Sequence, residues 1–350
     1  MKVLLFTHSQ DPDGAGCAIL ANLAFSIYTL VPTKTFDINK NVQKYIDNNF
    51  IYDYDNIFVT DLCIKEPLLT FINNDEILRN KVIIIDHHKS EIDEGNDKYS
   101  FVNIKIEENG IKVSGTSLFY DYLVSNGYLD ISLQNKKIVE NFVEYTRAYD
   151  TWDGTKENFE MGKKYHILFE NLSFQKYVDM IDDKITKLGS LEFNDFESKI
   201  ISRHEENSNK EILEAIKGMK IINFKLSNNI NYKIGFIDIE YKYRNDVNGV
   251  IKMNNKYDID VIGMIMKDTD TVSYRQVKNV DVSIIGKYFG GKGHREAASN
   301  LKNNEKFKEF IKFSLPVLAV SLLAQGSYSA YLFKNSWNRG NRFLFKRYVK

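Results

Sequence analysis

Carboxylate and imidazole side chains gather directly after short apolar or helical segments of this chain. They are His8, Asp11 and Asp13 after residues 3–6, Asp61 after residues 57–60, Asp86, His87 and His88 after residues 82–85, and Asp150 in a predicted helix near residue 145. Such ligands without thiolates favour manganese, magnesium, iron or zinc, and a carboxylate-rich set favours manganese or magnesium. Crowded carboxylates repel one another, so two bound cations are the simplest compensation. Two metal ions can clamp a phosphoryl group and activate water, which indicates phosphoester hydrolysis.

A second candidate site is the glycine-rich segment at residues 290–295. Its glycines let backbone amides approach an anion closely, and its cationic and titratable side chains add charge. The pattern also predicts a helix beginning near Glu296, whose N-terminus would favour an anion. A bare turn between helices would explain the glycines but not the charges beside them. The segment reads Gly290, Gly291, Lys292, Gly293, His294, Arg295.

Alternating strands and helices are predicted for the first half of the chain. Strands are expected at residues 2–7, 33–36, 57–60 and 81–86, and helices at residues 14–28, 41–48 and 66–72. Continuous apolar strands separated by helices are typical of a parallel sheet that is covered on both faces. Ligands of such sheets bind beyond the carboxyl ends of the strands, where the candidate aspartates and histidines fall.

The second half of the chain predicts a different arrangement. Two helices are expected within residues 115–150, a charged helical stretch at 159–218, strands at 220–226, 232–239, 261–266 and 271–276, and a helix at 245–254. The chain is therefore predicted to be α/β, with a parallel-sheet domain and a smaller α/β domain joined by a helical linker.

Composition limits the function classes that fit. The 350 residues are 43% hydrophobic, which is enough for two domains with their own cores. The 47 basic and 47 acidic side chains cancel, so a polyanion must be held by a local cleft. Cys17 and Cys63 have apolar neighbours and are expected to be buried thiols in a reducing compartment. The N-terminal residues show no secretory pattern, so a cytoplasmic protein is expected.

The C-terminal residues leave three interpretations open. The apolar stretch at residues 313–324 is too short to span a bilayer, which needs about 20 apolar residues. The residues after it are basic and aromatic without an acidic side chain. They could be a docked helix with a solvated tail, an auxiliary contact to nucleic acid or a partner, or an interfacial membrane anchor.

Taken in order, these motifs resemble the DHH phosphoesterase superfamily with its C-terminal DHHA1 domain. The resemblance covers residues 1–310, and the nano-RNase or short-oligonucleotide phosphodiesterase type is the most similar. It implies a catalytic metal-binding domain at residues 1–160, a helical linker at 161–218 and a substrate-binding DHHA1 domain at 219–312. The tail at 313–350 is left without a role. The matching motifs are the H-x-x-D-x-D-G run at 8–14, Asp61, Asp86-His87-His88, Asp150 and residues 290–298.

The resemblance also implies a role for each candidate residue. Two divalent ions, expected to be Mn²⁺, would be held by His8 and Asp11, by Asp13, His87 and Asp150, and by a bridging Asp61. His88 would face the substrate phosphate and Asp86 would orient the ligands. The terminal phosphate or base of the substrate would be held by Arg275, Gly290, Gly291, Gly293, His294 and Arg295.

Several residues near these motifs have simpler interpretations. Asp153 is the alternative to Asp150, in a weaker sequence context. Trp152 is expected to be a packing residue, and His166 and His204, in charged helical segments, are expected at the surface.

The expected function is manganese-dependent hydrolysis of short RNA oligonucleotides. The same chemistry would serve cyclic or linear dinucleotides and removal of phosphate from a bisphosphonucleotide such as pAp. A nucleotide-binding or RNA-binding module without turnover is the alternative from another class. The sequence predicts no membrane span and leaves a homodimer undecided.

Overall fold

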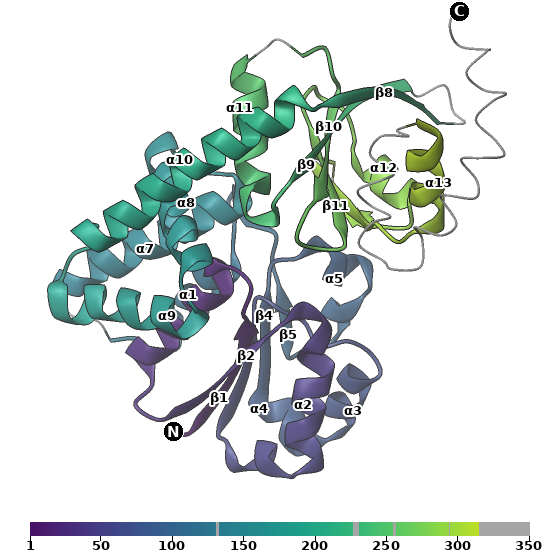
Figure 1. Cartoon of the computed structure of the whole chain (residues 1–350). Helices are drawn as coiled ribbons and strands as arrows, with labels where there is room; N and C mark the ends of the chain where they lie inside the picture. The colour runs from purple at the N-terminus through teal and green to yellow at the C-terminus, as the bar shows by residue number, and fades with distance from the viewer. Residues whose placement is uncertain (131–132, 227–230, 255–256, 294, 315–350) are drawn as a thin grey trace, which may run out of the picture. The chain divides into compact units, whose positions relative to one another are not determined.

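The computed structural model describes residues 1–130, 133–226, 231–254, 257–293 and 295–314, which form two compact units (Figure 1). Unit 1 comprises residues 1–204, and unit 2 begins at residue 205. Each unit contains a sheet with helices on both faces. The predicted α/β class is therefore confirmed.

Unit 1 is built on a five-stranded parallel sheet with the order β2-β1-β3-β4-β5. Its central strands have apolar side chains on both faces, as buried parallel strands require. The strands are β1 Val3–His8, β2 Tyr28–Thr33, β3 Asn56–Thr60, β4 Val82–Asp86 and β5 Val102–Ile104.

Two groups of helices cover the two faces of this sheet. Phe58 of β3 lies in the core that includes α1, α6, α7, α8 and α9, and Phe6 of β1 lies in the core that includes α2 and α3. The helices of unit 1 are α1 Pro12–Ala24, α2 Ile38–Asp47, α3 Leu68–Asn74, α4 Glu76–Lys81, α5 Lys89–Asp93, α6 Gly115–Ser125, α7 Leu133–Thr151, α8 Lys156–Asn171 and α9 Phe174–Asp183.

Two predictions about residues 14–36 are wrong. Helix α1 ends at Ala24, because Phe25 has an extended backbone with φ −125° and ψ 122°, and β2 occupies Tyr28–Thr33 instead of 33–36. Residues 28–33 pair with all six residues of β1, so this pairing decides the strand's position. The short strand β5 was not predicted.

The charged helical stretch contributes to the core of unit 1. Tyr165 of α8 and Tyr177 of α9 are fully buried there. The prediction that His166 and His204 lie at the surface is wrong, because both are buried. His166 contacts the ring of Tyr149 at a centroid distance of 4.9 Å, and charged neighbours along the sequence concealed this buried helix face. The domain boundaries at 160, 218 and 312 remain a prediction.

Unit 2 contains a six-stranded mixed sheet with the order β12-β13-β11-β10-β9-β8. Helices α12 and α13 contribute to the core on one face, and α10 and α11 to the core on the other. The elements are α10 Asp195–Lys217, which begins in unit 1, then β8 Lys220–Lys225, β9 Asn231–Ile239, α11 Arg244–Asn254, β10 Val261–Met266, β11 Thr271–Gln276, α12 Ser283–Tyr288, β12 Lys292–Gly293, β13 Ala297–Leu301 and α13 Glu305–Ser314.

The predicted helix beginning near Glu296 is wrong. Residues 297–301 form β13, which pairs antiparallel with β11 and places Ala298 opposite Tyr274. Alanine favours a helix in isolation, but pairing with a buried strand overrides this preference. The glycine-rich segment is therefore not followed by a helix N-terminus.

No helix within the described ranges is long and apolar enough to cross a membrane. The three interpretations of the C-terminal residues concern positions 315–350, which lie outside the described residues.

Candidate metal centre and a second polar pocket

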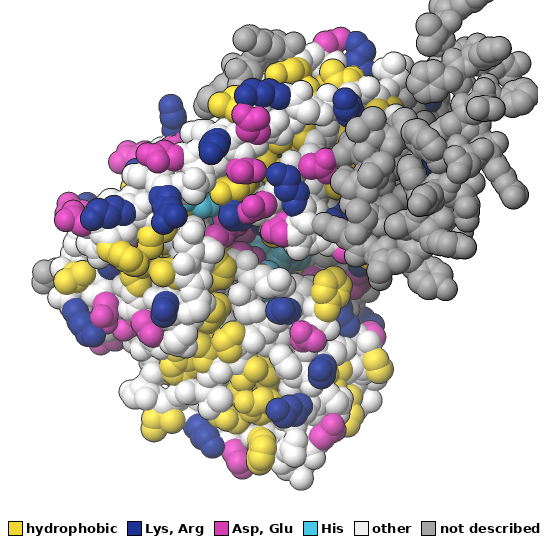
Figure 2. All heavy atoms as spheres, in the orientation of Figure 1, with side chains coloured by type: hydrophobic (Ala, Val, Ile, Leu, Met, Phe, Trp, Pro, Cys, Tyr) yellow, Lys and Arg dark blue, Asp and Glu magenta, His cyan; other side chains and the backbone are white. Residues whose placement is uncertain are grey.

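The carboxyl ends of three neighbouring strands bring the candidate ligands together. Strands β1, β3 and β4 are parallel and in register, with Thr7 beside Thr60 and Thr60 beside Ile85. His8, Asp61 and Asp86 therefore emerge at one edge of the sheet. Figure 2 shows histidine side chains reaching the surface beside acidic ones.

The ligand atoms form three groups, within each of which they lie no more than 4.8 Å apart. Each group has the donor types that divalent cations accept. The groups are His8, Asp11 and Asp61; Asp13, His87 and Asp150; and Asp61, Asp86, His87 and His88. All eight acidic and histidine residues predicted from the sequence are thus brought together.

Three polar atoms at this centre are buried without a hydrogen-bond partner among the described residues. They are Nδ1 of His8, Oδ2 of Asp61 and Oδ2 of Asp86. Nδ1 of His8 lies 2.8 Å from Oδ2 of Asp11 and 3.4 Å from Oδ2 of Asp61, without hydrogen-bonding geometry. Buried polar atoms without partners are costly, and a cation would satisfy them. The donor set therefore fits divalent metal ions.

The electrostatics of the centre also favour cations. Burial and the charges of Asp61 and Asp150 raise the pKa of Asp13 well above its usual value. Burial also raises the pKa of Asp150 to about 6, although His87 opposes the shift. Burial disfavours the charged form of His8, but the carboxylates of Asp11 and Asp61 outweigh it and raise its pKa to about 11. Without metal, protons thus balance the carboxylates, and a divalent ion would displace them.

Local structure fixes the positions of Asp61 and Asp11. Asp61 has a left-handed backbone with φ 56°, and its N–H donates to the carbonyl of Ile85 at 3.0 Å. Such a conformation costs a non-glycine residue about 1 kcal/mol or more and is often found at functional sites. Asp11 accepts from the N–H of Gly14 through Oδ1 and so also caps helix α1.

Asp13 is held by the first turn of helix α6. The N–H of Gly115 donates to Oδ2 of Asp13 at 2.6 Å, and the N–H of Thr116 donates to Oδ1 at 2.9 Å. A Cβ atom on Gly115 would lie 2.6 Å from Cβ of Asp61, so only glycine fits there. Sequence reasoning missed both donors, because backbone N–H groups 102 and 103 residues away leave no signal in residue type.

Asp86 contacts the backbone of His87 and the imidazole of His88. Its Oδ1 accepts from the backbone N–H of His87 at 2.8 Å and lies 2.7 Å from Nδ1 of His88. Hydrogen bonds of this kind orient an imidazole at a metal centre. The side chain of His88 is 46% exposed, so it can meet a substrate.

Helix α7 supplies Asp150, and the alternative Asp153 lies elsewhere. Asp153 accepts from the N–H of Lys112 at 2.9 Å and lies 3.9 Å from Arg147. It belongs to none of the three ligand groups found among the described residues. Trp152 is 52% exposed and stacks on Tyr149. The geometry therefore favours Asp150 as the ligand from this segment.

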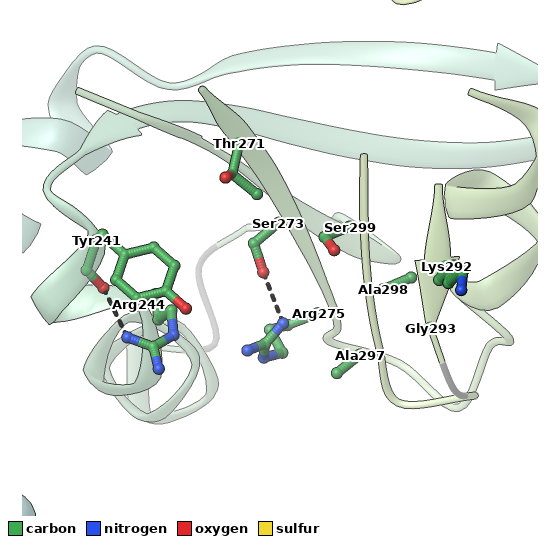
Figure 3. Close-up of a pocket in the computed structure, with 10 residues that line it drawn as sticks. All are labelled: Tyr241, Arg244, Thr271, Ser273, Arg275, Lys292, Gly293, Ala297, Ala298 and Ser299. Atoms are coloured by element: carbon green, nitrogen blue, oxygen red, sulfur yellow. Dashed lines mark hydrogen bonds between the residues drawn. The ribbon is translucent and has the colours of Figure 1, made fainter. Parts of the chain in front are cut away.

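The predicted substrate-binding residues of unit 2 are only partly brought together. A pocket of about 200 Å³ is lined by Arg275 and Gly293, but not by Gly290, Gly291 or Arg295 (Figure 3). The remaining candidate, His294, lies outside the described residues.

Close strand packing accounts for two of the glycines in unit 2. A Cβ atom on Gly291 would lie 1.8 Å from the carbonyl oxygen of Ser299, and one on Gly293 would lie 2.3 Å from Cα of Ala298. Both positions therefore require glycine because β12 and β13 approach closely. These glycines need no phosphate to explain them.

Residues 2–146 match the model of the DHH family, N-terminal domain. The chain is 26% identical over 310 residues to oligoribonuclease NrnB of Bacillus subtilis strain 168, which covers 88% of this chain and 74% of that protein. A solved DHH domain from a member of a ribosomal protein family aligns with TM-score 0.55 and 16% identity, over 90% of this chain and 86% of that one. The solved structure of the pGpG-specific phosphodiesterase PggH from Vibrio cholerae aligns with TM-score 0.51 and 11% identity, over 93% of this chain and 100% of that one. The two solved structures show a shared fold.

Proposed function

Because the chain carries a DHH family N-terminal domain, we propose that it is a metal-dependent phosphodiesterase that hydrolyses short RNA oligonucleotides. The observation that carries this proposal is the convergence of three ligand groups at the ends of β1, β3 and β4. The relationship to a protein named oligoribonuclease over 88% of this chain supports the substrate class.

The ligand groups suit two divalent ions, with manganese as the expected metal. His8 and Asp11 would hold one ion, Asp13, His87 and Asp150 would hold the other, and Asp61 would be shared by both. Ions held there would neutralise charge on a phosphodiester and lower the pKa of water.

The protein's own residues orient the reacting groups. Asp13 accepts two backbone hydrogen bonds from α6, so its carboxylate has a fixed position. Asp86 holds Nδ1 of His88, which leaves Nε2 as the nitrogen that faces a phosphate oxygen of the substrate. A preorganised donor at that position stabilises charge that develops on phosphorus-bound oxygens.

The proposal is tested by hydrolysis of 5′-labelled RNAs from two to about twenty nucleotides with Mn²⁺, beside cyclic dinucleotides and pAp. We expect the shortest RNAs to be cleaved fastest. Asp150→Asn should abolish cleavage, because it removes a proposed ligand. Asp153→Asn is the matched control and should remain active, since Asp153 lies outside the ligand groups.

Other outcomes would redirect the proposal. Selective cleavage of a cyclic dinucleotide would identify a signal-degrading enzyme, and selective loss of phosphate from pAp a phosphatase. Nucleotide binding without turnover of any substrate would contradict the enzymatic proposal and indicate a binding module.

A further inference from the structure

The turn after helix α7 holds Trp152 in an unusual conformation. Trp152 has a left-handed backbone with φ 53°, which is rare for a bulky side chain. It follows the proposed ligand Asp150 by two residues. Left-handed backbones of this kind persist only where the surrounding structure enforces them, and they are common at active sites and ligand-binding sites. The turn is therefore a candidate for a functional role.

Contacts on the far side of Trp152 fix this turn. Oδ2 of Asp153 accepts from the backbone N–H of Lys112 at 2.9 Å, which ties the turn to the segment before α6. A Cβ atom on Gly154 would lie 2.6 Å from Cβ of Ala148, so the chain returns closely onto α7. The position of the Trp152 backbone therefore does not depend on a ligand.

An aromatic cluster supports the indole ring of Trp152. Its ring centroid lies 6.2 Å from that of Tyr149, with 26° between the planes, and 5.0 Å from that of Phe159 in α8. Tyr149 and Phe159 lie 5.1 Å apart, and His166 contacts Tyr149. Helices α7 and α8 pack against each other in unit 1, so the cluster has a rigid base (Figure 1). Trp152 is nevertheless 52% exposed.

An exposed indole on a rigid support has the properties of a base-stacking surface. Every nucleotide base presents a π-face, so bases stack on aromatic side chains with little sequence preference. Asp150 belongs to the ligand group with Asp13 and His87, at which a substrate phosphate would bind. Two residues of chain span at most about 7 Å, so the backbone of Trp152 lies close to that of Asp150. One nucleotide could therefore meet the metal centre and the indole.

We propose that Trp152 is a stacking surface for a nucleotide base next to the scissile phosphate, and that it determines specificity for nucleotides over other phosphodiesters. The inference rests on the proposed function, because the stacked base belongs to a substrate whose phosphate lies at the metal centre. It gives a function to a side chain that the sequence predicted only as a packing residue. Stacking does not read the edges of a base, so the presence of a base should matter more than its identity.

The fluorescence of Trp152 measures stacking directly. The chain has two tryptophans, so Trp337→Phe leaves Trp152 as the single indole of the full-length protein. The probe is a ribodinucleotide that carries a methylene group in place of the bridging oxygen and cannot be hydrolysed, at a constant concentration of Mn²⁺. We expect saturable quenching of the Trp152 emission by this probe. The same probe without its bases should give no quenching at equal concentrations.

Substitutions separate a role of the ring from a role in folding. Trp152→Ala should lower kcat/KM for a ribodinucleotide about 5- to 150-fold, as expected for the loss of one stacked base, and leave kcat/KM for the abasic analogue unchanged. Trp152→Phe keeps a ring and should restore most of the activity. Phe50→Ala is the matched control, because Phe50 is 57% exposed and precedes β3, at the sheet edge opposite the metal centre. It should match the wild type with both substrates.

Three outcomes would overturn the stacking surface. They are quenching by the abasic probe equal to that by the full probe, unchanged kcat/KM in Trp152→Ala, and an equal loss with the ribodinucleotide and its abasic analogue. The last outcome would show that Trp152 only supports the fold.

These outcomes are distinguishable from failure of the proposed function. Hydrolysis of short RNA with no quenching and with unchanged kinetics in Trp152→Ala would overturn the stacking surface alone. Base-dependent quenching without hydrolysis of any RNA would support the stacking surface and overturn the enzymatic proposal.

Discussion

At the scale of single residues, the metal centre combines groups that repel one another with groups that hold them in place. Asp13 and Asp61 are almost fully buried, and the imidazoles of His8 and His87 lie among them. Without metal ions, protons on the histidines balance the carboxylates, so the stability of the centre depends on pH. A bound cation would replace these protons.

The first prediction concerns the stability of the metal-free protein. The raised pKa of Asp150, about 6, penalises folding as pH rises from about 4 to 6. The raised pKa of His8, about 11, stabilises the fold fully below pH 6.5, and this contribution is lost as pH rises toward 11. The two raised pKa values therefore both predict that the free energy of unfolding of the metal-free protein falls between pH 5 and 9. We expect Mn²⁺ to raise the Tm more at pH 8.5 than at pH 5.5.

Thermal unfolding followed by circular dichroism, in EDTA and in Mn²⁺, measures this difference. Asp61→Asn is the control, because removing a proposed bridging ligand should reduce the shift at both pH values. Equal shifts of the wild-type protein at the two pH values would contradict the prediction.

The second prediction concerns Gly115. A Cβ atom there would lie 2.6 Å from Cβ of Asp61 and 3.0 Å from Oδ2 of Asp13. Overpacking of this kind typically costs about 1–3 kcal/mol. We therefore expect Gly115→Ala to lower the free energy of unfolding by about that amount and to reduce turnover at least about 10-fold.

Gly218→Ala is the matched control, because its Cβ would meet only the carbonyl oxygen of Ala215 at 3.5 Å. Denaturant unfolding and steady-state kinetics of both variants make the comparison. Wild-type turnover in Gly115→Ala would show that the contact of α6 with Asp13 does not position the ligand.

At the scale of elements, an ion pair joins the segment after Asp61 to the helix after His88. Nζ of Lys65 lies 2.5 and 2.6 Å from the two carboxylate oxygens of Glu91 in α5, and 2.8 Å from Glu94. Glu91 is nearly buried and also accepts from Asn96 at 2.8 Å. Lys65 thereby connects two segments that carry proposed ligands.

We expect Lys65→Met to lower kcat at least about 10-fold with a smaller change in KM, because misplaced ligands affect the reacting geometry more than substrate binding. Lys65→Arg should restore much of the activity. Lys105→Met, which breaks an exposed pair with Glu108, is the control and should match the wild type. Steady-state kinetics decide the matter, and an unchanged kcat in Lys65→Met would contradict a positioning role.

The same scale explains what the sequence could and could not predict. The ends of parallel strands share one edge, so the apolar runs before His8, Asp61 and Asp86 were sufficient to predict their convergence. The Lys65–Glu91 pair joins residues 26 positions apart through side chains that look like ordinary surface charges. The strand β13 was missed because only its pairing with β11 distinguishes it from a helix.

At the scale of the whole molecule, two units with separate cores carry the candidate metal centre and the second polar pocket. The alternating pattern predicted a parallel sheet and a second α/β domain, and the boundaries expected at residues 160, 218 and 312 remain a prediction. Helix α10 passes through the division and contributes Ile201 to a core of unit 1 and Ile212 to a core of unit 2. Acidic and basic residues occur along the whole of this helix, so its sequence does not show where it passes from one core to the other.

The central claim is that the cluster at the strand ends acts with two divalent ions. Its most direct test is a titration of metal-free protein with Mn²⁺ in which bound metal and hydrolysis of a ribodinucleotide are measured in the same samples. We predict two bound ions per chain, and turnover that rises only as the second site fills. In Asp61→Asn, we expect neither a stoichiometry of two ions nor turnover. Full turnover in EDTA, or maximal turnover with a single bound ion, would contradict the account.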